Sequence, residues 1–495
     1  MGALRDFLEE LKDAGELNVV EESIDWDLQA AAICAMSQRT GGPAVQFSNV
    51  KDYKGVSLAG GLLAGPGFIE WPQMPRKMHG RIAMGLGLEP DTHYTDLLLT
   101  VMDRTDSPIR AVEVDSGPCQ EIVIEADDVD LYKYPVPRLH DKDGGRYLTF
   151  HAVLVRDEEK AWTNMGVYRL QLADKNSLVC GSIPRRTWPT DLQRIVQKYH
   201  EKGKGAPFAV VLGPPPEMIM AAALSSMEGT DEYAIAGGLG LNSIPLLKGR
   251  LSDIMVPANA EVVLEGHIYP REVAEEGPFG SISYYLEKSG NNLVFRVESI
   301  TQRKEPVLPF IAESARPSDT MCLFSVLHSA ELQKILRGCG LPVKWVILPV
   351  EARLCAAVVC LAAQPVPGLQ GRVGHLINAY SPFVRHVTVV DPDLDSEDLP
   401  SIITDRSWKA CVERDYYISS KVDKPLGWTE NHSFKEQLGS SILIDATWRN
   451  DRNPATMPRR ISFENCFPEE VRKRVLSRWN EEWKLSPKAF EYEIK

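Results

Sequence analysis

Residues 121–315 limit the fold most strongly, because they consist of short apolar runs separated by turn residues. The runs are rich in β-branched residues and include Thr149–Val155, Ala209–Leu212, Glu261–Glu265 and Leu293–Val297. Short β-branched runs bounded by turns are typical of strands. We therefore expect a barrel-like β domain that carries one or two helices, one of them over Glu217–Leu224.

The sequence on either side of this region alternates between helix-like and strand-like patterns. Before it, Leu4–Leu11 and Asp96–Met102 have helical spacing, and Ala44–Phe47 resembles a strand. After it, Ala356–Ala363 has a helix-like pattern and Val387–Val390 a strand-like one. Both flanks are therefore expected to be α/β units.

Turn clusters mark the two borders of the β-rich region, at Asp115–Pro118 and at Arg316–Asp319. A chain of 495 residues is too long for one compact core. We predict an α+β protein of three domains: an N-terminal α/β domain over residues 1–118, a β domain over 119–315 and a C-terminal α/β domain over 316–495.

The last predicted helix carries an apolar stripe. Its members Val471, Val475, Trp479 and Trp483 recur at steps of four residues and therefore share one face. Two tryptophans on an exposed face need cover. We expect that cover to come from the body of this chain or from a neighbouring subunit.

Composition and local patterns exclude several classes of protein. The formal net charge of −13 opposes a nucleic-acid partner, which would need a basic face. The first residues lack the uninterrupted apolar run of a signal peptide, and no run of about 18 apolar residues could span a membrane. The nine scattered cysteines, with no C-x-x-C pair, fit reduced thiols. The sequence predicts a cytoplasmic protein with no nucleic-acid or membrane partner.

Three segments of the central region combine polar residues with stiff turns. Trp162–Arg169 reads as a strand of mixed polarity that ends in an arginine, and Ser225–Glu232 follows the predicted helix. In Glu275–Ser281 two glycines flank Pro-Phe, so a carboxylate on this turn is held in position. Each segment alone is more often structural than functional. The glycine-rich stretches match no phosphate-binding fingerprint, and the histidines show no metal-ligand spacing.

Together these segments resemble the UbiD family in type and in order. The shared motifs are a Trp-Thr-Asn strand ending in Arg169, the turn Gly213–Pro216 and its helix, Ser-Ser-Met ahead of a glutamate, Val-Leu-Glu-Gly, Glu-Gly-Pro-Phe-Gly, and Ile444–Thr447. The similarity covers nearly the whole chain and is greatest to the ferulic-acid and aromatic-acid decarboxylases. It implies an N-terminal α/β domain, a central split β-barrel that binds flavin, and a C-terminal α/β oligomerisation domain with a terminal helix.

The resemblance implies prenylated FMN as the cofactor. Loss of CO2 from an sp2 carbon leaves an unstable carbanion, and side chains offer no electron sink, so a cofactor must supply one. By resemblance, Arg169 holds the substrate carboxylate, a task that suits the guanidinium fork. Glu276 would hydrogen-bond to Arg169 and orient it.

The third catalytic position implied by the resemblance is Ser281. Family members have an acid there, one residue past Gly-Pro-Phe-Gly, and it protonates the product. A hydroxyl group is a poor general acid near neutral pH. Either a water chain from Glu275 or Glu276 supplies the proton, or the chemistry of this chain is altered.

The resemblance also implies a divalent ion, usually manganese, that binds the flavin phosphate. The matching positions are Asn164, Glu232 and Thr187, and the family has histidine at the last of these. A carboxylate beside a dianionic phosphate needs a cation between them, and a hydroxyl is a weaker ligand than imidazole. A potassium ion is implied at the positions Trp162, Leu224, Met227 and Glu232.

The cofactor contacts implied by the family lie in the same segments. They are Thr149, Asn164, Val167, Tyr168, Arg169, Arg186, Ser225, Ser226, Met227 and Glu232. Arg185 and Arg186 directly precede Thr187, so we hypothesise that they bind the phosphate and partly replace the metal.

The leading interpretation is a homo-oligomeric carboxy-lyase, a dimer or larger. It would interconvert an aromatic, heteroaromatic or α,β-unsaturated carboxylic acid with CO2 and the decarboxylated product, and would depend on a flavin prenyltransferase for its cofactor. A second interpretation is a non-catalytic or partner-dependent subunit of a UbiD-like heteromeric carboxylase. Ser281 and Thr187 favour it, whereas four retained residues oppose it: Arg169, Glu276, Asn164 and Glu232. A third is an ordinary flavin oxidoreductase, because split barrels elsewhere bind FMN.

Overall fold

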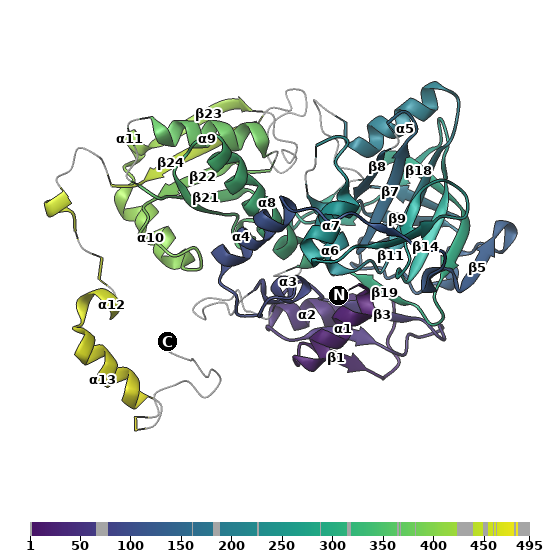
Figure 1. The fold of residues 1–495 in the computed structure, drawn as a ribbon, viewed down its shortest axis with the longest axis horizontal. Helices are drawn as coiled ribbons and strands as arrows, with labels where there is room; N and C mark the ends of the chain where they lie inside the picture. The colour runs from purple at the N-terminus through teal and green to yellow at the C-terminus, as the bar shows by residue number, and fades with distance from the viewer. Residues whose placement is uncertain are drawn as a thin grey trace. The chain divides into compact units, whose positions relative to one another are not determined.

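The computed structural model describes all residues except 1, 66–77, 161, 182–188, 225–226, 288, 314–317, 364–365, 367, 382, 423–438, 449–453, 459, 462, 480–481 and 484–495. The chain divides into two compact units, a main unit of residues 1–447 and a C-terminal unit of residues 448–495. Strands and helices alternate through the main unit (Figure 1), which confirms the predicted α+β class.

An antiparallel sheet of ten strands forms the centre of the main unit. Its strands pair in the order β6-β9-β10-β18-β14-β11-β7-β8, and β5 and β15 also pair with β18. The strands are β5 (Ile122–Glu125), β6 (Tyr147–Leu148), β7 (His151–Asp157), β8 (Trp162–Gly166), β9 (Leu170–Asp174), β10 (Ser177–Cys180), β11 (Ala206–Leu212), β14 (Val262–Ile268), β15 (Val273–Glu276) and β18 (Gly290–Gln302). They confirm the short runs expected in this region. Strands β6 and β8 lie at the two ends of this order, and among the described residues no pairing joins them to close a barrel. The split-barrel layout therefore stays a prediction.

Three helices lie against or beside this sheet. Helix α5 (Asp191–Glu201) packs on β7, β8 and β11 through an apolar face that includes Ile195 and Tyr199. Helix α6 (Pro216–Ala223) starts with proline and is buried along its whole length, which confirms the helix predicted there. Helix α7 (Glu232–Gly240) packs on α6.

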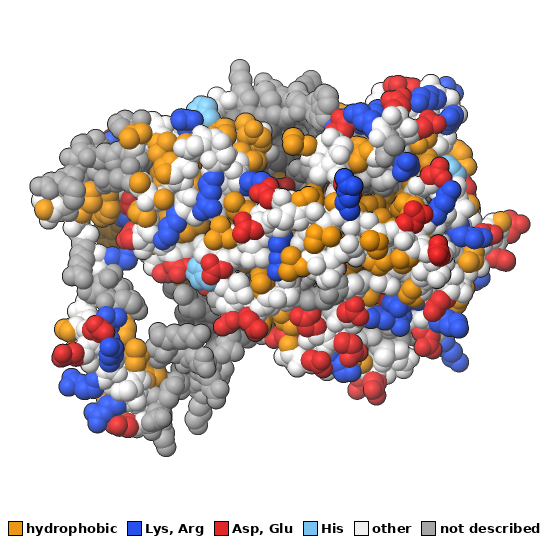
Figure 2. All heavy atoms as spheres, in the orientation of Figure 1, with side chains coloured by type: hydrophobic (Ala, Val, Ile, Leu, Met, Phe, Trp, Pro, Cys, Tyr) orange, Lys and Arg blue, Asp and Glu red, His pale blue; other side chains and the backbone are white. Residues whose placement is uncertain are grey.

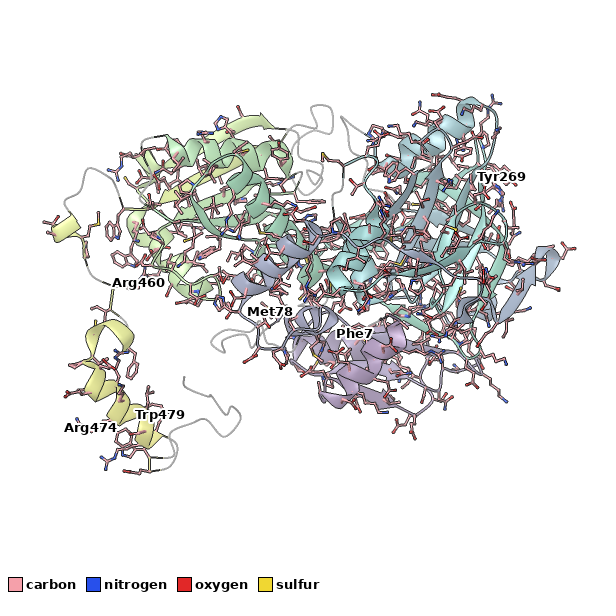
Figure 3. All side chains as sticks on the ribbon, in the orientation of Figure 1. Phe7, Met78, Tyr269, Arg460, Arg474 and Trp479 are labelled. Atoms are coloured by element: carbon pink, nitrogen blue, oxygen red, sulfur yellow. The ribbon has the colours of Figure 1, made fainter. Side chains whose placement is uncertain are left out.

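A smaller sheet gathers the N-terminal strands in the order β1-β2-β3-β19. They are β1 (Leu17–Val20), β2 (Ala44–Phe47), β3 (Ser57–Gly60) and β19 (Val307–Phe310). Strand β19 comes from far along the chain and pairs in parallel with β3. The helices of this region are α1 (Leu4–Asp13), α2 (Gln29–Arg39), α3 (Gly80–Gly85) and α4 (Tyr94–Thr105). On α1 the helical spacing buries Leu4, Leu8, Leu11 and Phe7, the last labelled in Figure 3.

A third sheet has the strand order β20-β21-β22-β24-β23. Its strands are β20 (Val343–Ile347), β21 (Ala356–Leu361), β22 (His386–Val390), β23 (Tyr416–Val422) and β24 (Gly439–Ala446). The helix predicted over Ala356–Ala363 is therefore wrong. This run is a strand flanked by β20 and β22, and its buried faces make it continuously apolar. Spacing alone cannot distinguish such a strand from a buried helix.

Helices connect the sheets of the main unit. Helix α8 (Asp319–Gly338) packs on β20, α4 and α6, and lies between the third sheet and the central one in Figure 1. The remaining helices of this region are α9 (Leu369–Tyr380), α10 (Leu399–Lys409) and α11 (Val412–Asp415). Short strands complete the unit: β4 (Val112–Glu113), β12 (Pro245–Lys248) and β13 (Met255–Pro257) form one small sheet, and β16 (Phe279–Gly280) and β17 (Leu286–Glu287) form another.

Charged side chains of both signs are interspersed over the face shown in Figure 2. Near α5, for example, Lys202 and Lys204 both pair with Glu158, and Lys198 pairs with Asp157. Acidic side chains near α5 are thus neutralised by neighbouring lysines. Within the described ranges, no helix has the length and apolar character needed to cross a membrane.

The C-terminal unit contains α12 (Phe463–Cys466) and α13 (Glu469–Trp479). Val471, Val475 and Trp479 lie at steps of four on α13 and are half-buried, and Figure 3 labels Trp479. Trp483, beyond the helix, is 42% exposed. Cover of this stripe by a neighbouring subunit stays a prediction.

Candidate active site

A cavity of about 290 Å³ opens between the central sheet and α8. This volume is near the lower end of the roughly 300–1,000 Å³ typical of small-molecule sites. The structure brings eight of the predicted site residues to its walls: Thr149, Asn164, Val167, Tyr168, Arg169, Leu224, Glu232 and Ser281. Apolar side chains complete much of the lining, among them Met165, Phe279, Ile282, Phe324 and Phe383.

Arg169, just beyond β8, forms an ion pair with Glu276 at the end of β15. Arg169 Nε donates to Glu276 Oε1 at 2.9 Å, and Nη2 donates to Oε2 at 3.1 Å. Such a bidentate pair fixes the plane of the guanidinium group. The glycine at 181 permits this position, because a Cβ there would collide with the Arg169 side chain. The predicted pairing of Arg169 with Glu276 is therefore present.

A second carboxylate, Glu287, lies on the remaining side of the guanidinium group. Arg169 Nη1 donates to Glu287 Oε2. Glu287 comes from β17, where it pairs opposite Phe279 of β16. Burial alone would lower the pKa of Arg169, but the hydrogen bonds and charges of Glu276 and Glu287 raise it. Glu287 was not predicted from the sequence, because the hairpin register that brings it here has no local signature.

Aromatic side chains shield the Arg169–Glu276 pair from water. The Phe279 ring lies 4.7 Å from the Arg169 guanidinium carbon and 4.4 Å from the Tyr147 ring. The Tyr147 hydroxyl lies 3.1 Å from Glu276 Oε1. Burial and the negative charge of Glu276 raise the pKa of Tyr147, so its hydroxyl stays a donor. Glu276 itself is 1% exposed.

The turn that carries Glu276 and Ser281 is anchored by side chains from elsewhere. The backbone N–H of Gly277 donates to Gln171 Oε1 at 2.8 Å, and that of Gly280 donates to Asp143 Oδ1 at 2.8 Å. These bonds hold the turn in place, as the flanking glycines predicted. Ser281 is buried and lines the cavity, with no charge to offer there.

Glu313 is a third carboxylate of this region, and it faces the cavity itself. It is 6% exposed, and the Thr320 hydroxyl donates to its Oε1. Its Oε2 forms no hydrogen bond of good geometry with the described residues, although the Ser318 side chain lies close enough to interact with the carboxyl group. Burial and the negative charge of Asp319 raise the pKa of Glu313 to about 7. Glu313 was not predicted from the sequence, because the local sequence around a single glutamate does not show that its side chain is buried.

Asn164 and Glu232, the predicted metal ligands, both line the cavity. The indole N–H of Trp162 donates to Glu232 Oε2 at 3.4 Å and to the carbonyl of Thr230 at 2.6 Å. Burial raises the pKa of Glu232 to about 8. Asn164 Nδ2 is buried and has no hydrogen-bond partner among the described residues.

Four of the predicted site residues, Arg186, Thr187, Ser225 and Ser226, lie outside the described residues. The side chain of Met227 is 84% exposed, and Met227 is not among the described residues that line the cavity. Its backbone carbonyl accepts from the N–H of Thr230. The roles of these five residues stay predictions.

Two models of one protein family match the chain. The N-terminal domain of 3-octaprenyl-4-hydroxybenzoate carboxy-lyase, UbiD_N, matches residues 8–100, and the Rift-related domain of the same enzyme, UbiD, matches residues 110–316. Together they cover more than half of the chain.

The chain belongs to the UbiD family. Pyrrole-2-carboxylic acid decarboxylase of Pseudomonas aeruginosa is 28% identical over 493 residues, which is 96% of this chain and 97% of the relative. The structure of the UbiD-class enzyme HmfF of Pelotomaculum thermopropionicum, solved with FMN, superposes with a TM-score of 0.81 at 25% sequence identity. The match covers 94% of this chain and 98% of HmfF. An evolved dimeric form of HmfF, solved with prenylated FMN, has a TM-score of 0.78 at 25% identity, with 93% of this chain and 97% of that one covered. The chain is a carboxy-lyase of this family.

The residues of this UbiD-family cavity fit a flavin phosphate bound through a divalent cation. The buried Glu232 carboxylate has no described cation beside it, and the Asn164 Nδ2 atom has no hydrogen-bond partner among the described residues. An oxygen ligand from each would suit Mn²⁺ or Mg²⁺. The apolar lining, including Met165 and Leu224, suits a planar ring system.

Proposed function

We propose that the chain is a prenylated-FMN-dependent, reversible decarboxylase of an aromatic or heteroaromatic carboxylic acid, with α,β-unsaturated acids as a related class. One observation carries the proposal: the Arg169 guanidinium fork is held by the buried carboxylate of Glu276 at the wall of a partly apolar cavity. The pyrrole-2-carboxylic acid decarboxylase relative and the flavin-bound HmfF structures support the substrate and cofactor classes.

In this function Arg169 binds the substrate carboxylate and Glu276 keeps the guanidinium plane aimed at it. Phe279, Phe324 and Phe383 pack against the aromatic ring and exclude water from it. When bound, prenylated FMN supplies the electron sink that the side chains lack. The charge of Arg169 is retained throughout, because two carboxylates stabilise it.

The cofactor is proposed to be held by the family's set of positions. Asn164, Glu232 and Thr187 would bind a divalent ion such as Mn²⁺ at the flavin phosphate. Arg186, Ser225, Ser226, Thr149, Val167 and Tyr168 would contact the flavin, and Trp162, Leu224, Met227 and Glu232 would bind K⁺. Six of the described members line the cavity: Thr149, Asn164, Val167, Tyr168, Leu224 and Glu232.

The proposed setting follows the family as well. Residues 119–315 would form a split barrel around the flavin, between an N-terminal domain of residues 1–118 and an oligomerisation domain of residues 316–495. The enzyme would be a cytoplasmic homodimer or larger homo-oligomer supplied by a flavin prenyltransferase. Size-exclusion chromatography with light scattering measures its oligomeric state.

Co-expression with a flavin prenyltransferase tests the cofactor and the reaction together. Under anaerobic handling, the purified protein should carry a flavin with the mass of prenylated FMN. It should then release CO2 from at least one member of a panel of pyrrole-2-carboxylic, benzoic and cinnamic acids. Retention of unmodified FMN alone, or of no flavin, would refute the proposal.

A second candidate is a non-catalytic subunit of a heteromeric carboxylase. It is favoured by the uncharged Ser281 at the position where the family carries an acid. The Ser281→Glu variant separates the two functions. If wild type and Ser281→Glu both bind prenylated FMN and both leave every acid unchanged, the non-catalytic subunit is the better description.

A further inference from the structure

We infer that Glu313 supplies the product proton in this chain, in place of the carboxylate that position 281 lacks. The inference rests on the proposed function. It concerns a residue that lies outside all the family motifs recognised in the sequence and belongs to the segment after β19.

The cavity places Glu313 with the groups that would bind the substrate. Arg169, Ser281 and Glu313 all line the same space. A serine at 281 offers no carboxylate there, so Glu313 is an acid of this cavity that is not paired with Arg169. Glu276 and Glu287 both form ion pairs with the guanidinium group.

Two sets of contacts join Glu313 to the turn around Ser281. His140 bridges them: its Nε2 lies 3.1 Å from the Glu313 carbonyl and its Nδ1 lies 3.0 Å from Asp143 Oδ2. Asp143 Oδ1 in turn accepts from the N–H of Gly280, directly before Ser281. On another side, Arg353 Nη1 donates to the carbonyl of Ile282 at 2.9 Å and its charge acts on Glu313. The two positions are therefore parts of one local structure.

The surroundings of Glu313 keep it able to donate. Its Oε1 is held by Thr320, whereas Oε2 is left without a partner among the described residues. Burial and the charge of Asp319 raise the pKa of Glu313 to about 7, and the charge of Arg353 opposes them. A group with this pKa is protonated in a large fraction of molecules at neutral pH and is efficient in general acid catalysis.

The proposed step balances in atoms and charge. The bond between the ring carbon and the carboxylate carbon breaks and CO2 leaves. The electron pair of that bond ends in a new C–H bond, whose proton comes from the Glu313 carboxyl group. Glu313 is left as a carboxylate and regains a proton from water, and in the carboxylation direction it accepts the same proton.

Glu313→Gln tests the inference on the enzyme loaded with prenylated FMN. It should keep its flavin and lose about a hundredfold or more in kcat, since positioned proton transfer contributes about 10²–10⁴-fold. Enzyme-catalysed exchange of the product C–H proton with D2O should fall in parallel. Glu217→Gln is the matched control: Glu217 is also buried and also has its pKa raised to about 7, but it lies on α6 outside the cavity lining. Its activity should equal that of wild type.

The pH profile and a rescue variant exclude a merely structural effect. Wild-type kcat should be high below about pH 7 and fall above it as Glu313 loses its proton, and Glu313→Gln should lack this fall. The groups that face Glu313 stay in place in both proteins; they are Asp319, Arg353, His140, Thr320 and Ser318. The double variant Ser281→Glu/Glu313→Gln should have a kcat at least about tenfold higher than that of the Glu313→Gln variant.

Two outcomes overturn the inference and can be told apart. A wild-type enzyme that turns over normally, with Glu313→Gln within threefold of it and showing the same fall above pH 7, refutes the role of Glu313 alone. A wild-type protein that carries prenylated FMN but releases no CO2 from any acid refutes the proposed function, and the role of Glu313 with it.

Discussion

Glu287 of β17 occupies the one terminal nitrogen of Arg169 that Glu276 leaves free. A substrate carboxylate would need that same nitrogen to form its own pair with the fork. Glu287 Oε1 has no partner among the described residues, so only Oε2 ties this hairpin to Arg169. The hairpin therefore competes with the substrate for Arg169.

Glu287→Gln should lower KM for the acid roughly tenfold and change kcat little, because a neutral amide competes less well with the substrate carboxylate. A hydrogen bond to a charged group is worth about 1.5–3 kcal/mol, which sets this scale. Steady-state kinetics give the split between KM and kcat. The control is Glu113→Gln, which alters an exposed carboxylate on β4 and should change neither value. An unchanged KM in Glu287→Gln would show that substrate and hairpin do not compete.

Arg169→Ala should abolish turnover while the flavin stays bound. Removing one partner of a buried charged pair costs about 3–5 kcal/mol, which corresponds to at least roughly a hundredfold in rate. Arg169→Lys should fail to rescue activity, because a point charge lacks the bidentate fork. The measurements are CO2 release and the flavin absorption spectrum of each variant. Recovery of half the wild-type rate by the lysine variant would contradict the role of the fork.

Thr187→His should increase retention of manganese. An imidazole is a stronger ligand than a hydroxyl, and even an outer-shell partner usually changes metal affinity about 10–100-fold. Metal content after dialysis against a weak chelator, measured by mass spectrometry, gives the comparison. Glu232→Gln should lose metal in the same assay. Equal retention by wild type and Thr187→His would mean that another group already completes the ligand set.

Glu217→Gln should stabilise the protein at alkaline pH. Burial raises the pKa of Glu217 to about 7, so the folded state holds its proton more tightly than the unfolded state does. Its carboxyl group therefore reduces stability progressively as the pH rises from about 4.5 to about 7. The variant should gain on the order of 2–3 kcal/mol in the free energy of unfolding at pH 8 and little at pH 4. Urea denaturation at the two pH values measures both.

Deletion of residues 467–495 should dissociate the oligomer or make the protein insoluble. The deletion removes the apolar stripe of α13, whose side chains are half-buried in the described structure. The surface that this stripe covers would then be exposed, and exposed apolar surface promotes aggregation. Light scattering of the soluble fraction decides the matter. A soluble truncation with the oligomeric state of the full chain would show that the stripe is covered within one subunit.

The sequence predicted those parts of the site that a local pattern defines. Arg169 follows a strand of mixed polarity, and Glu276 precedes a turn that two glycines mark, so both were found and both meet in the structure. Glu287 and Glu313 were missed because their roles arise from contacts between distant segments. A register between β16 and β17 brings in Glu287, and burial beside α8 defines Glu313.

Secondary structure was likewise predicted correctly where a local sequence pattern defines it, and wrongly where contacts with distant strands define it. The strands β7 and β11 and the helix α6 follow from turn residues and β-branched runs. The strand β21 was mistaken for a helix, because a run that is apolar at every position carries no periodicity to read. Its identity depends on β20 and β22, which flank it in the sheet.

The pairing of β3 with β19 has a consequence for how the chain is made. During synthesis, β3 leaves the ribosome long before residue 307, so its edge stays without its parallel partner while the whole central sheet is translated. An open strand edge is prone to pair with other chains. A nascent chain of this protein therefore exposes the edge of β3 to other chains until β19 pairs with it, closes the N-terminal layer and brings Glu313 to the cavity.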